Sequence, residues 1–323
     1  VLGAVVWLLF PKVVAWGVHG HGSKLMAAMY LPWIVGWALK VLDGEGKRAV
    51  GMTGLLIGLQ ILSGHVQITY YTLLVTGWLA VWNTVRPFES DLCRVDPGLR
   101  WRRLVFLALG ISLGFAIGGI MLLPVHDYAG ISIRGQDTAG GGGVGLDYAT
   151  GWSLAPSELG TLVMPSSAGF GQATYLGHMP FTDYPNYLGF LSLLLAAVGW
   201  SRGGRNLFIA LGVMSFLAIL VSFGNFGPGL YELLYRWLPF FNKFRIPSMI
   251  LIVVAFSLAV LAGRGAASWR EGNWPGGRPR WWAAGLGLVG LILFLGGAGS
   301  VIRSSYEGTL SALAAAALSL IHI

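Results

Sequence analysis

Four short segments of the sequence carry side chains that could bind a ligand, and each lies beside a long apolar run. The segments are 10–24, 64–71, 126–134 and 242–248. Lysine and arginine there could bind phosphate, arginine through planar bidentate contacts and lysine as a point charge. Histidine, glutamine and tyrosine could hydrogen-bond to a sugar or stack on it. The candidate substrate-binding or lipid-phosphate-binding residues are His19, His21, Lys24, His65, Gln67, Tyr70, Tyr71, Lys243 and Arg245.

Each candidate also has an ordinary structural interpretation, which stays open from the sequence. His65 could cap a helix, and Tyr70 and Tyr71 could be interfacial aromatics. Lys243 and Arg245 could simply extend toward lipid headgroups. Two histidines spaced i and i+2 in a glycine-rich loop are a weak metal signal, so no cofactor is indicated, although a divalent metal is left open. Taken together, the basic groups indicate an anionic partner.

A catalytic carboxylate is harder to assign. Asp127 is the acid closest to the end of an apolar run, and it follows Leu122-Leu123-Pro124 at the end of that run. It is the candidate catalytic residue, since an acid could remove a proton from an attacking hydroxyl. The alternative is a loop residue that pairs with Arg134 or Lys243.

The composition requires these residues to be positioned by membrane helices. Hydrophobic residues make up 55% of the chain and charged residues only 11%, whereas soluble domains carry about 25% charged residues. The net charge of +8 lies in short connections between apolar runs, and no segment has the basic and aromatic pattern of nucleic-acid binding. The sequence therefore predicts an all-α polytopic membrane protein without a nucleic-acid partner.

The apolar runs predict about ten transmembrane helices, because each crossing needs about 20 mostly apolar residues. The expected spans are 1–10, 25–42, 49–64, 66–83, 104–124, 186–200, 206–223, 246–263, 281–299 and 308–323. They divide the chain into membrane helices 1–123, an extracytoplasmic loop 124–185 and membrane helices 186–323. Both ends of the sequence fall inside apolar runs, so we expect a piece of a longer protein.

Lysine and arginine predict the orientation of these helices. Connections 40–48, 83–103, 200–206 and 263–281 hold 14 basic residues, whereas the alternating connections hold 7. By the positive-inside rule the first set is cytoplasmic, which places the candidate residues and loop 124–185 outside.

Local patterns make three further predictions. Runs 49–64 and 66–83 are separated only by Gly64-His65 and should form a tight helical hairpin. Gly110, Gly114 and Gly118 recur every four residues, which favours close packing between helices of one bundle. Segment 153–165 reads as a short helix on the outer membrane surface, whereas the Gly140–Gly143 run should form a mobile loop.

Several segments resemble the YfhO family of bacterial membrane proteins. They are FPKVVAWGVHGHGSKLMAAMYLPW (10–33), GHVQITYYTLL (64–74), ATGWSLAPSELGTLVMP (149–165) and LPFFNKFRIPSMIL (238–251). That family is similar to the GT-C membrane glycosyltransferases. The resemblance implies a multi-pass protein of the bacterial cytoplasmic membrane. It also implies an enzyme that moves a sugar from a polyprenyl-phosphate donor to a lipid or polymer acceptor of the cell envelope.

The sequence departs from the GT-C pattern in one respect. Such enzymes place a catalytic acid in the first external loop, and this chain begins after that point, so we expect its general base to lie upstream and the chain alone to be inactive. Two alternatives stay open, a non-catalytic scaffold for envelope assembly and a lipid flippase or transporter. Few charges lie within the spans, and no internal repeat relates the two halves, which disfavours a transporter.

Overall fold

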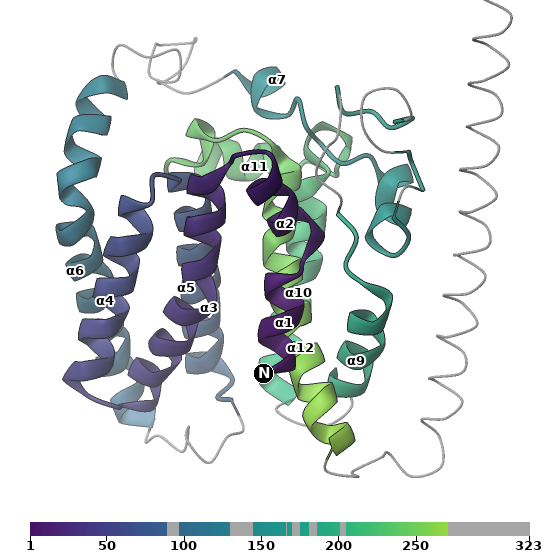
Figure 1. Ribbon diagram of the computed structural model, residues 1–323. Helices are drawn as coiled ribbons and strands as arrows, with labels where there is room; N and C mark the ends of the chain where they lie inside the picture. Colours follow the sequence, from purple (N-terminus) through teal and green to yellow (C-terminus); the bar gives the residue numbers. More distant parts are fainter. Residues whose placement is uncertain are drawn as a thin grey trace, which may run out of the picture.

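The computed structural model describes residues 1–88, 97–129, 145–165, 167–169, 175–180, 186–200 and 205–270. Within these ranges all regular secondary structure is helical (Figure 1). Three segments are long and apolar enough to cross a membrane, namely Gly22–Asp43, Trp101–Tyr128 and Pro247–Arg270. Phe190–Trp200 and Asn206–Ser222 are shorter apolar helices. The chain is therefore an all-helical membrane protein, and the count of about ten spans remains a prediction.

One group of helices is built from the first half of the chain. Its members are α3 (Gly22–Asp43), α4 (Lys47–Leu62), α5 (Val66–Val85) and α6 (Pro97–Ala129). Helix α4 packs mainly between α3 and α6, while α5 packs on α3 (Figure 1). The buried Gln60 joins three of them, because its Nε2 donates to the Ala27 carbonyl of α3 at 2.8 Å and to Thr72 Oγ1 of α5 at 2.8 Å.

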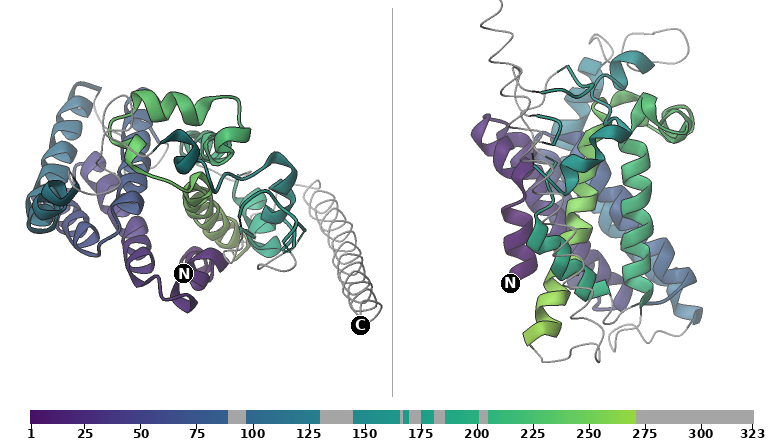
Figure 2. Two further views of the ribbon diagram at one scale, coloured as in Figure 1. Left: turned by 90° about the horizontal axis from the view of Figure 1, so that it is seen from above. Right: turned by 90° about the vertical axis from the view of Figure 1, so that its right-hand side faces the viewer.

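The second group surrounds a central helix. Its members are α1 (Leu2–Leu8), α9 (Phe190–Trp200), α10 (Arg205–Ser222) and α12 (Leu251–Arg270). Helix α12 contacts α1, α9 and α10 and is largely enclosed by them, as the view from above shows (Figure 2). The rings of Trp7 on α1 and Phe256 on α12 meet edge to face at 6.1 Å. Trp78 Nε1 of α5 donates to the Ala210 carbonyl of α10 at 2.9 Å and so links the two groups.

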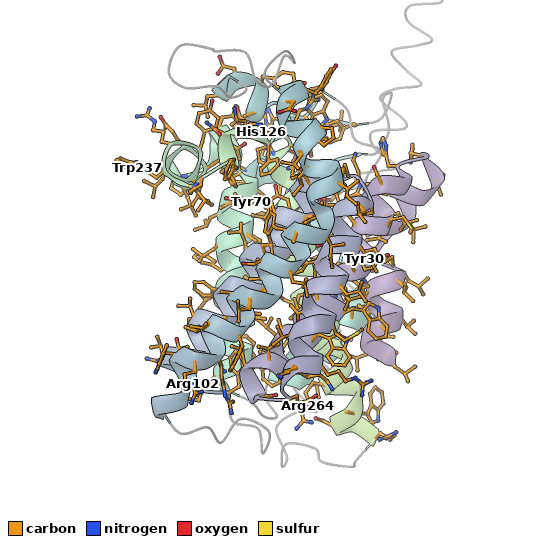
Figure 3. The ribbon with its side chains drawn as sticks, turned by 90° about the vertical axis from the view of Figure 1, so that its left-hand side faces the viewer. Tyr30, Tyr70, Arg102, His126, Trp237 and Arg264 are labelled. Atoms are coloured by element: carbon orange, nitrogen blue, oxygen red, sulfur yellow. The ribbon has the colours of Figure 1, made fainter. Side chains whose placement is uncertain are left out.

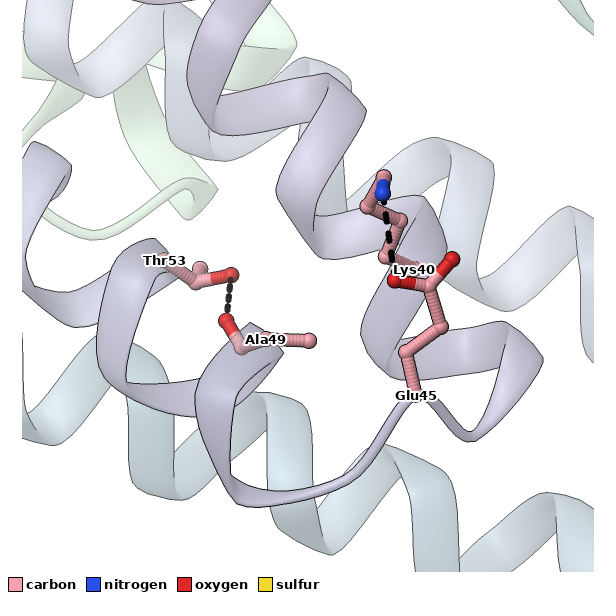
Figure 4. A network of polar contacts seen from close by, with 4 residues as sticks. All are labelled: Lys40, Glu45, Ala49 and Thr53. Atoms are coloured by element: carbon pink, nitrogen blue, oxygen red, sulfur yellow. Dashed lines mark hydrogen bonds and ion pairs between the residues drawn. The ribbon is translucent and has the colours of Figure 1, made fainter.

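The helices define two ends of the bundle. Arg102 and Arg264 lie at one end, here called the Arg102 end, whereas His126 and Trp237 lie at the other, here called the His126 end (Figure 3). The α3–α4 turn, from the basic set of connections, lies at the Arg102 end, and the α4–α5 turn, from the other set, lies at the His126 end. The assignment of all connections to two sides of a membrane stays a prediction. At the Arg102 end the α3–α4 turn is closed by the Lys40–Glu45 ion pair at 3.1 Å (Figure 4).

The glycines of α6 pack inside the bundle, as predicted. A Cβ at Gly114 would lie 2.5 Å from Ile57 Cγ2 and 3.0 Å from the Gly54 carbonyl oxygen, both on α4. Gly110 and Gly118 face the same helix. The small side chains therefore let the α4 and α6 backbones approach closely within one chain.

Two expectations about the connections need correction. The expected span 104–124 is longer in the structure, where helix α6 continues through Pro124 to Ala129. Runs 49–64 and 66–83 do form consecutive helices around Gly64, whose φ is +84°. They diverge after the turn, however, because α3 and α6 provide the larger packing surfaces for α4.

The short helices lie at the His126 end. They are α2 (Pro11–Val18), α7 (Leu146–Ala149), η1 (Pro156–Leu162), η2 (Gly224–Phe226), α11 (Leu230–Trp237), η3 (Phe241–Lys243) and η4 (Pro247–Ile250). The short helix expected in 153–165 is present as the 3₁₀ helix η1. Its buried Glu158 accepts the Ala155 N–H at 3.0 Å. Arg134, Gly140–Gly143 and the two last expected spans lie outside the described residues.

Candidate functional site

A cationic pocket of about 170 Å³ opens at the His126 end of the bundle. Its walls come from α2, the first turn of α3, the segment around Trp152 and the start of η4. Four basic side chains line it, namely Lys12, His21, Lys24 and Arg245. Apolar walls beside them are provided by Trp16 and Met249. Segments that are more than 200 residues apart in the sequence thus place four basic groups around one cavity.

Lys12 is the most buried of these groups. It stands in the first turn of α2, and its Nζ donates to Asn186 Oδ1 at 2.7 Å and to the Ser248 carbonyl at 3.0 Å. Burial, helped by the nearby Lys24 ammonium, lowers the pKa of Lys12 to about 7 from the usual 10.5. Near neutral pH about half of the Lys12 side chains are therefore protonated, and an anion in the pocket would favour the charged form.

Arg245 is held between two aromatic rings. Its guanidinium carbon lies 4.5 Å from the ring centre of Tyr148 and 4.5 Å from that of Trp152. One terminal nitrogen donates to the Tyr148 hydroxyl. Within the described part of the chain, the buried Nε atom of Arg245 has no hydrogen-bond partner. Stacking fixes the plane of the guanidinium, whose side chain lines the pocket.

The backbone around Arg245 is unusual. Phe240 and Ile246 adopt positive φ values of 63° and 66°, which non-glycine residues rarely do. Two hydrogen bonds hold the second turn, from Ile246 N to the Ala149 carbonyl at 3.2 Å and from Ser248 N to the Trp152 carbonyl at 3.3 Å. Left-handed turns therefore aim the Arg245 side chain into the pocket, and such strained conformations cluster at functional sites.

The candidates on α5 support this segment from behind. Gln67 Nε2 donates to the Arg245 carbonyl at 2.7 Å and to Tyr71 Oη at 2.8 Å. The Tyr70 hydroxyl donates to the Pro239 carbonyl at 2.8 Å, and its ring packs 5.0 Å from that of Phe244. Gln67, Tyr70 and Tyr71 do not line the pocket and so position Arg245 rather than contact a ligand there.

Three other candidates lie outside the pocket lining. His65 caps α5, because its Nδ1 accepts the Ile68 N–H at 3.3 Å, which agrees with its structural interpretation. The ring of His19 bonds to the Ala15 carbonyl at 2.9 Å through Nδ1. Lys243, two residues before Arg245, ends η3 and does not line the cavity. Of the candidate basic residues, His21, Lys24 and Arg245 are therefore the ones that meet.

The electrostatics of the pocket favour an anion. Desolvation is the main cause that lowers the pKa of His21, followed by the charges of Lys24 and His19. The described residues that line the pocket include no carboxylate. After desolvation, the Lys24 charge lowers the pKa of Lys12, and the Arg245 charge likewise opposes that of Lys24, so these close basic groups repel each other. A bound phosphate would relieve this repulsion.

The acids lie elsewhere at this end. Asp127 is near the end of α6, where its side chain is 87% exposed and its Oδ1 lies 3.6 Å from His126 Nδ1. It does not line the cationic pocket. Asp147, one residue before Tyr148, lines a second and more polar cavity of about 140 Å³ with His178 and Asn225.

The sequence alone did not indicate several residues of the pocket. Asn186 fixes Lys12, while Tyr148 and Trp152 enclose Arg245. A weak signal was present, because Tyr148 and Trp152 are aromatics four residues apart directly before the short helix η1. In comparisons of the whole chain, no protein-family model, curated protein sequence or solved structure matches it.

Proposed function

We propose that this chain is a multi-pass protein of about ten spans whose cationic pocket binds the phosphate of a polyprenyl-phosphate-linked sugar. The observation that carries the proposal is the meeting of Lys12, His21, Lys24 and Arg245 around one cavity. The richer basic connections at the opposite end support an extracytoplasmic position for the pocket, in a bacterial cytoplasmic membrane.

The reaction that fits this pocket is glycosyl transfer to an acceptor of the cell envelope, as the likeness to GT-C enzymes implies. An acceptor hydroxyl attacks the anomeric carbon, and the bond between that carbon and the phosphate oxygen breaks. The bonding electrons leave with the polyprenyl phosphate, and a base takes the hydroxyl proton. Arg245 and Lys24 would stabilise the charge that develops on the leaving phosphate.

The base must come from outside the described lining of the cationic pocket. Asp147 is a better placed candidate than Asp127, because Asp147 directly precedes Tyr148, which packs on Arg245. The absence of a carboxylate from the described lining also favours the alternative of a non-catalytic scaffold that binds the same lipid phosphate. A flippase would likewise need this pocket, but nothing in its geometry favours that function.

The first experiment measures binding. The full chain in detergent micelles is mixed with polyprenyl monophosphate or with the corresponding polyprenol, and bound lipid is quantified by native mass spectrometry. We expect Arg245→Gln and Lys24→Gln to weaken phosphate-lipid binding about tenfold or more, because hydrogen bonds to charged groups contribute about 1.5–3 kcal/mol. Lys243→Gln is the matched control, since it removes a nearby charge that does not line the pocket.

The outcomes separate the alternatives. Equal binding of the phosphate and the alcohol, or equal weakening by the control, would show that the pocket is not a phosphate site. If the pocket variants weaken phosphate-lipid binding and the control does not, sugar transfer is measured next. Wild type, Asp147→Asn and Asp127→Asn are each assayed with a labelled polyprenyl-phosphate donor. Transfer that only Asp147→Asn abolishes supports the enzyme. Specific binding without transfer is expected both for the scaffold and for an enzyme whose general base lies upstream of this chain.

A further inference from the structure

A third and larger cavity lies at the Arg102 end of the bundle. It has a volume of about 530 Å³ and opens between the α3–α4 turn and the first turns of α6. Lys47, Arg102 and Arg103 line it together with an apolar surface that includes Phe106 and Leu109. This cavity lies at the opposite end from the cationic pocket, and no role is assigned to it so far.

The polar part of this cavity is built around one arginine. Arg103 donates through a terminal nitrogen to the Leu42 carbonyl in the last turn of α3. Gly44 follows with a φ of +89°, and a Cβ at that position would lie only 2.7 Å from Arg103 Nη2. The turn thus needs glycine both for its conformation and to leave room for the guanidinium.

Two further cations, Lys47 and Arg102, line the cavity beside Arg103. Lys47 begins α4, and Arg102 precedes Arg103 on α6, with both side chains exposed. The described lining residues include no carboxylate. Glu45, the closest acid in the sequence, pairs instead with Lys40 (Figure 4). The basic groups therefore present a net positive charge toward the cavity.

The apolar part of the cavity continues toward the middle of α6. Phe106 and Leu109 are 46% and 54% exposed although they lie within a helix that is long and apolar enough to cross a membrane. Leu109 stands seven positions after Arg102, which is about 10 Å along a helix at 1.5 Å per residue. Charge at the membrane surface and an apolar wall below it match the two parts of a phospholipid.

We propose that this cavity binds an anionic phospholipid of the leaflet at the Arg102 end. Its phosphate lies among Lys47, Arg102 and Arg103, and one acyl chain lies along Phe106 and Leu109. Basic pockets between membrane helices are suited to anionic headgroups. A free phosphate would leave the apolar wall uncovered, so the lipid is the occupant that uses both surfaces. The inference does not depend on the proposed function of the cationic pocket.

The test uses the purified full chain in mixed micelles that contain phosphatidylglycerol or phosphatidylcholine, with retained lipid counted by native mass spectrometry. We expect preferential retention of phosphatidylglycerol. The double variant Lys47→Gln with Arg102→Gln should weaken it about 30-fold, since each basic side chain contributes about fivefold near an anionic surface. The matched control is Lys40→Gln with Arg48→Gln, which removes two charges at the same end outside the cavity lining.

A second pair of measurements tests whether the cavity binds the whole phospholipid or only its phosphate headgroup. Phe106→Ser should also weaken retention of phosphatidylglycerol, and millimolar glycerol phosphate should not displace it. Equal retention of both lipids, equal loss in the control, or displacement by glycerol phosphate would overturn the proposal. If the double variant does not fold, Arg102→Gln alone provides the test, with an expected loss of about fivefold.

Discussion

The buried Lys12 should make the stability of the protein depend on pH, and Lys12→Met should remove this dependence. In the folded state its pKa is about 7, whereas an unfolded lysine keeps a value near 10.5. Between these values the unfolded state holds a proton that the folded state has released, so raising the pH favours folding. Because folded Lys12 is half protonated at pH 7, the gain between pH 7 and pH 9 is about 2 kcal/mol.

The assay is equilibrium unfolding in mixed micelles, followed by tryptophan fluorescence at several pH values from 7 to 9. Other titrating groups contribute equally to both proteins, so the difference between the two profiles isolates Lys12. Lys12→Met also leaves Asn186 Oδ1 and the Ser248 carbonyl without this donor, which shifts stability by the same amount at every pH. Lys243→Gln should keep the wild-type slope. Parallel profiles for wild type and Lys12→Met would refute the reasoning.

Three further substitutions and one control, Gly119→Leu, test the packing and the support of the site. Gly114→Leu should destabilise the protein by about 1–3 kcal/mol in the same unfolding assay, because its side chain would overlap Ile57. Gly119→Leu, on the same helix but facing open space, should leave stability nearly unchanged. Gln60→Leu should cost about 1–3 kcal/mol, because it leaves a buried hydroxyl and a carbonyl of neighbouring helices without their shared donor. Gln67→Leu should weaken polyprenyl-phosphate binding severalfold without unfolding the chain, and unchanged binding would remove its positioning role.

The sequence predicted those features of the fold that depend on composition and residue spacing within a single segment. Long apolar runs predicted the membrane helices, and a four-residue glycine spacing predicted the close contact of α4 with α6. Successive connections are alternately rich and poor in lysine and arginine, which predicted that they lie at opposite ends of the bundle. The end of α6 lies five residues beyond the expected span 104–124, because the apolar run marks the membrane-crossing part of a helix and not the end of its backbone hydrogen bonding.

The site could be predicted only in part. His21, Lys24 and Arg245 were indicated because basic groups beside apolar runs are unusual and need a partner. The sequence could not show that Arg245 lines the pocket and Lys243 does not. Their segment contains left-handed turns and has no regular helical or strand period, so the spacing of residues does not predict which side chains share a face. The aromatic walls at Tyr148 and Trp152 meet Arg245 across about 95 residues of chain, a contact that only the folded bundle creates.

The enclosed position of α12 has a consequence for the biogenesis of the protein. Helix α1 packs mainly on α12, yet about 240 residues separate them in the chain. At about 5–20 residues per second, a ribosome needs roughly 10–50 s to make the intervening segment. During that time the face of α1 that packs on α12 must be covered by other neighbours. Synthesis of the intervening chain therefore sets the earliest time at which this half of the bundle can close.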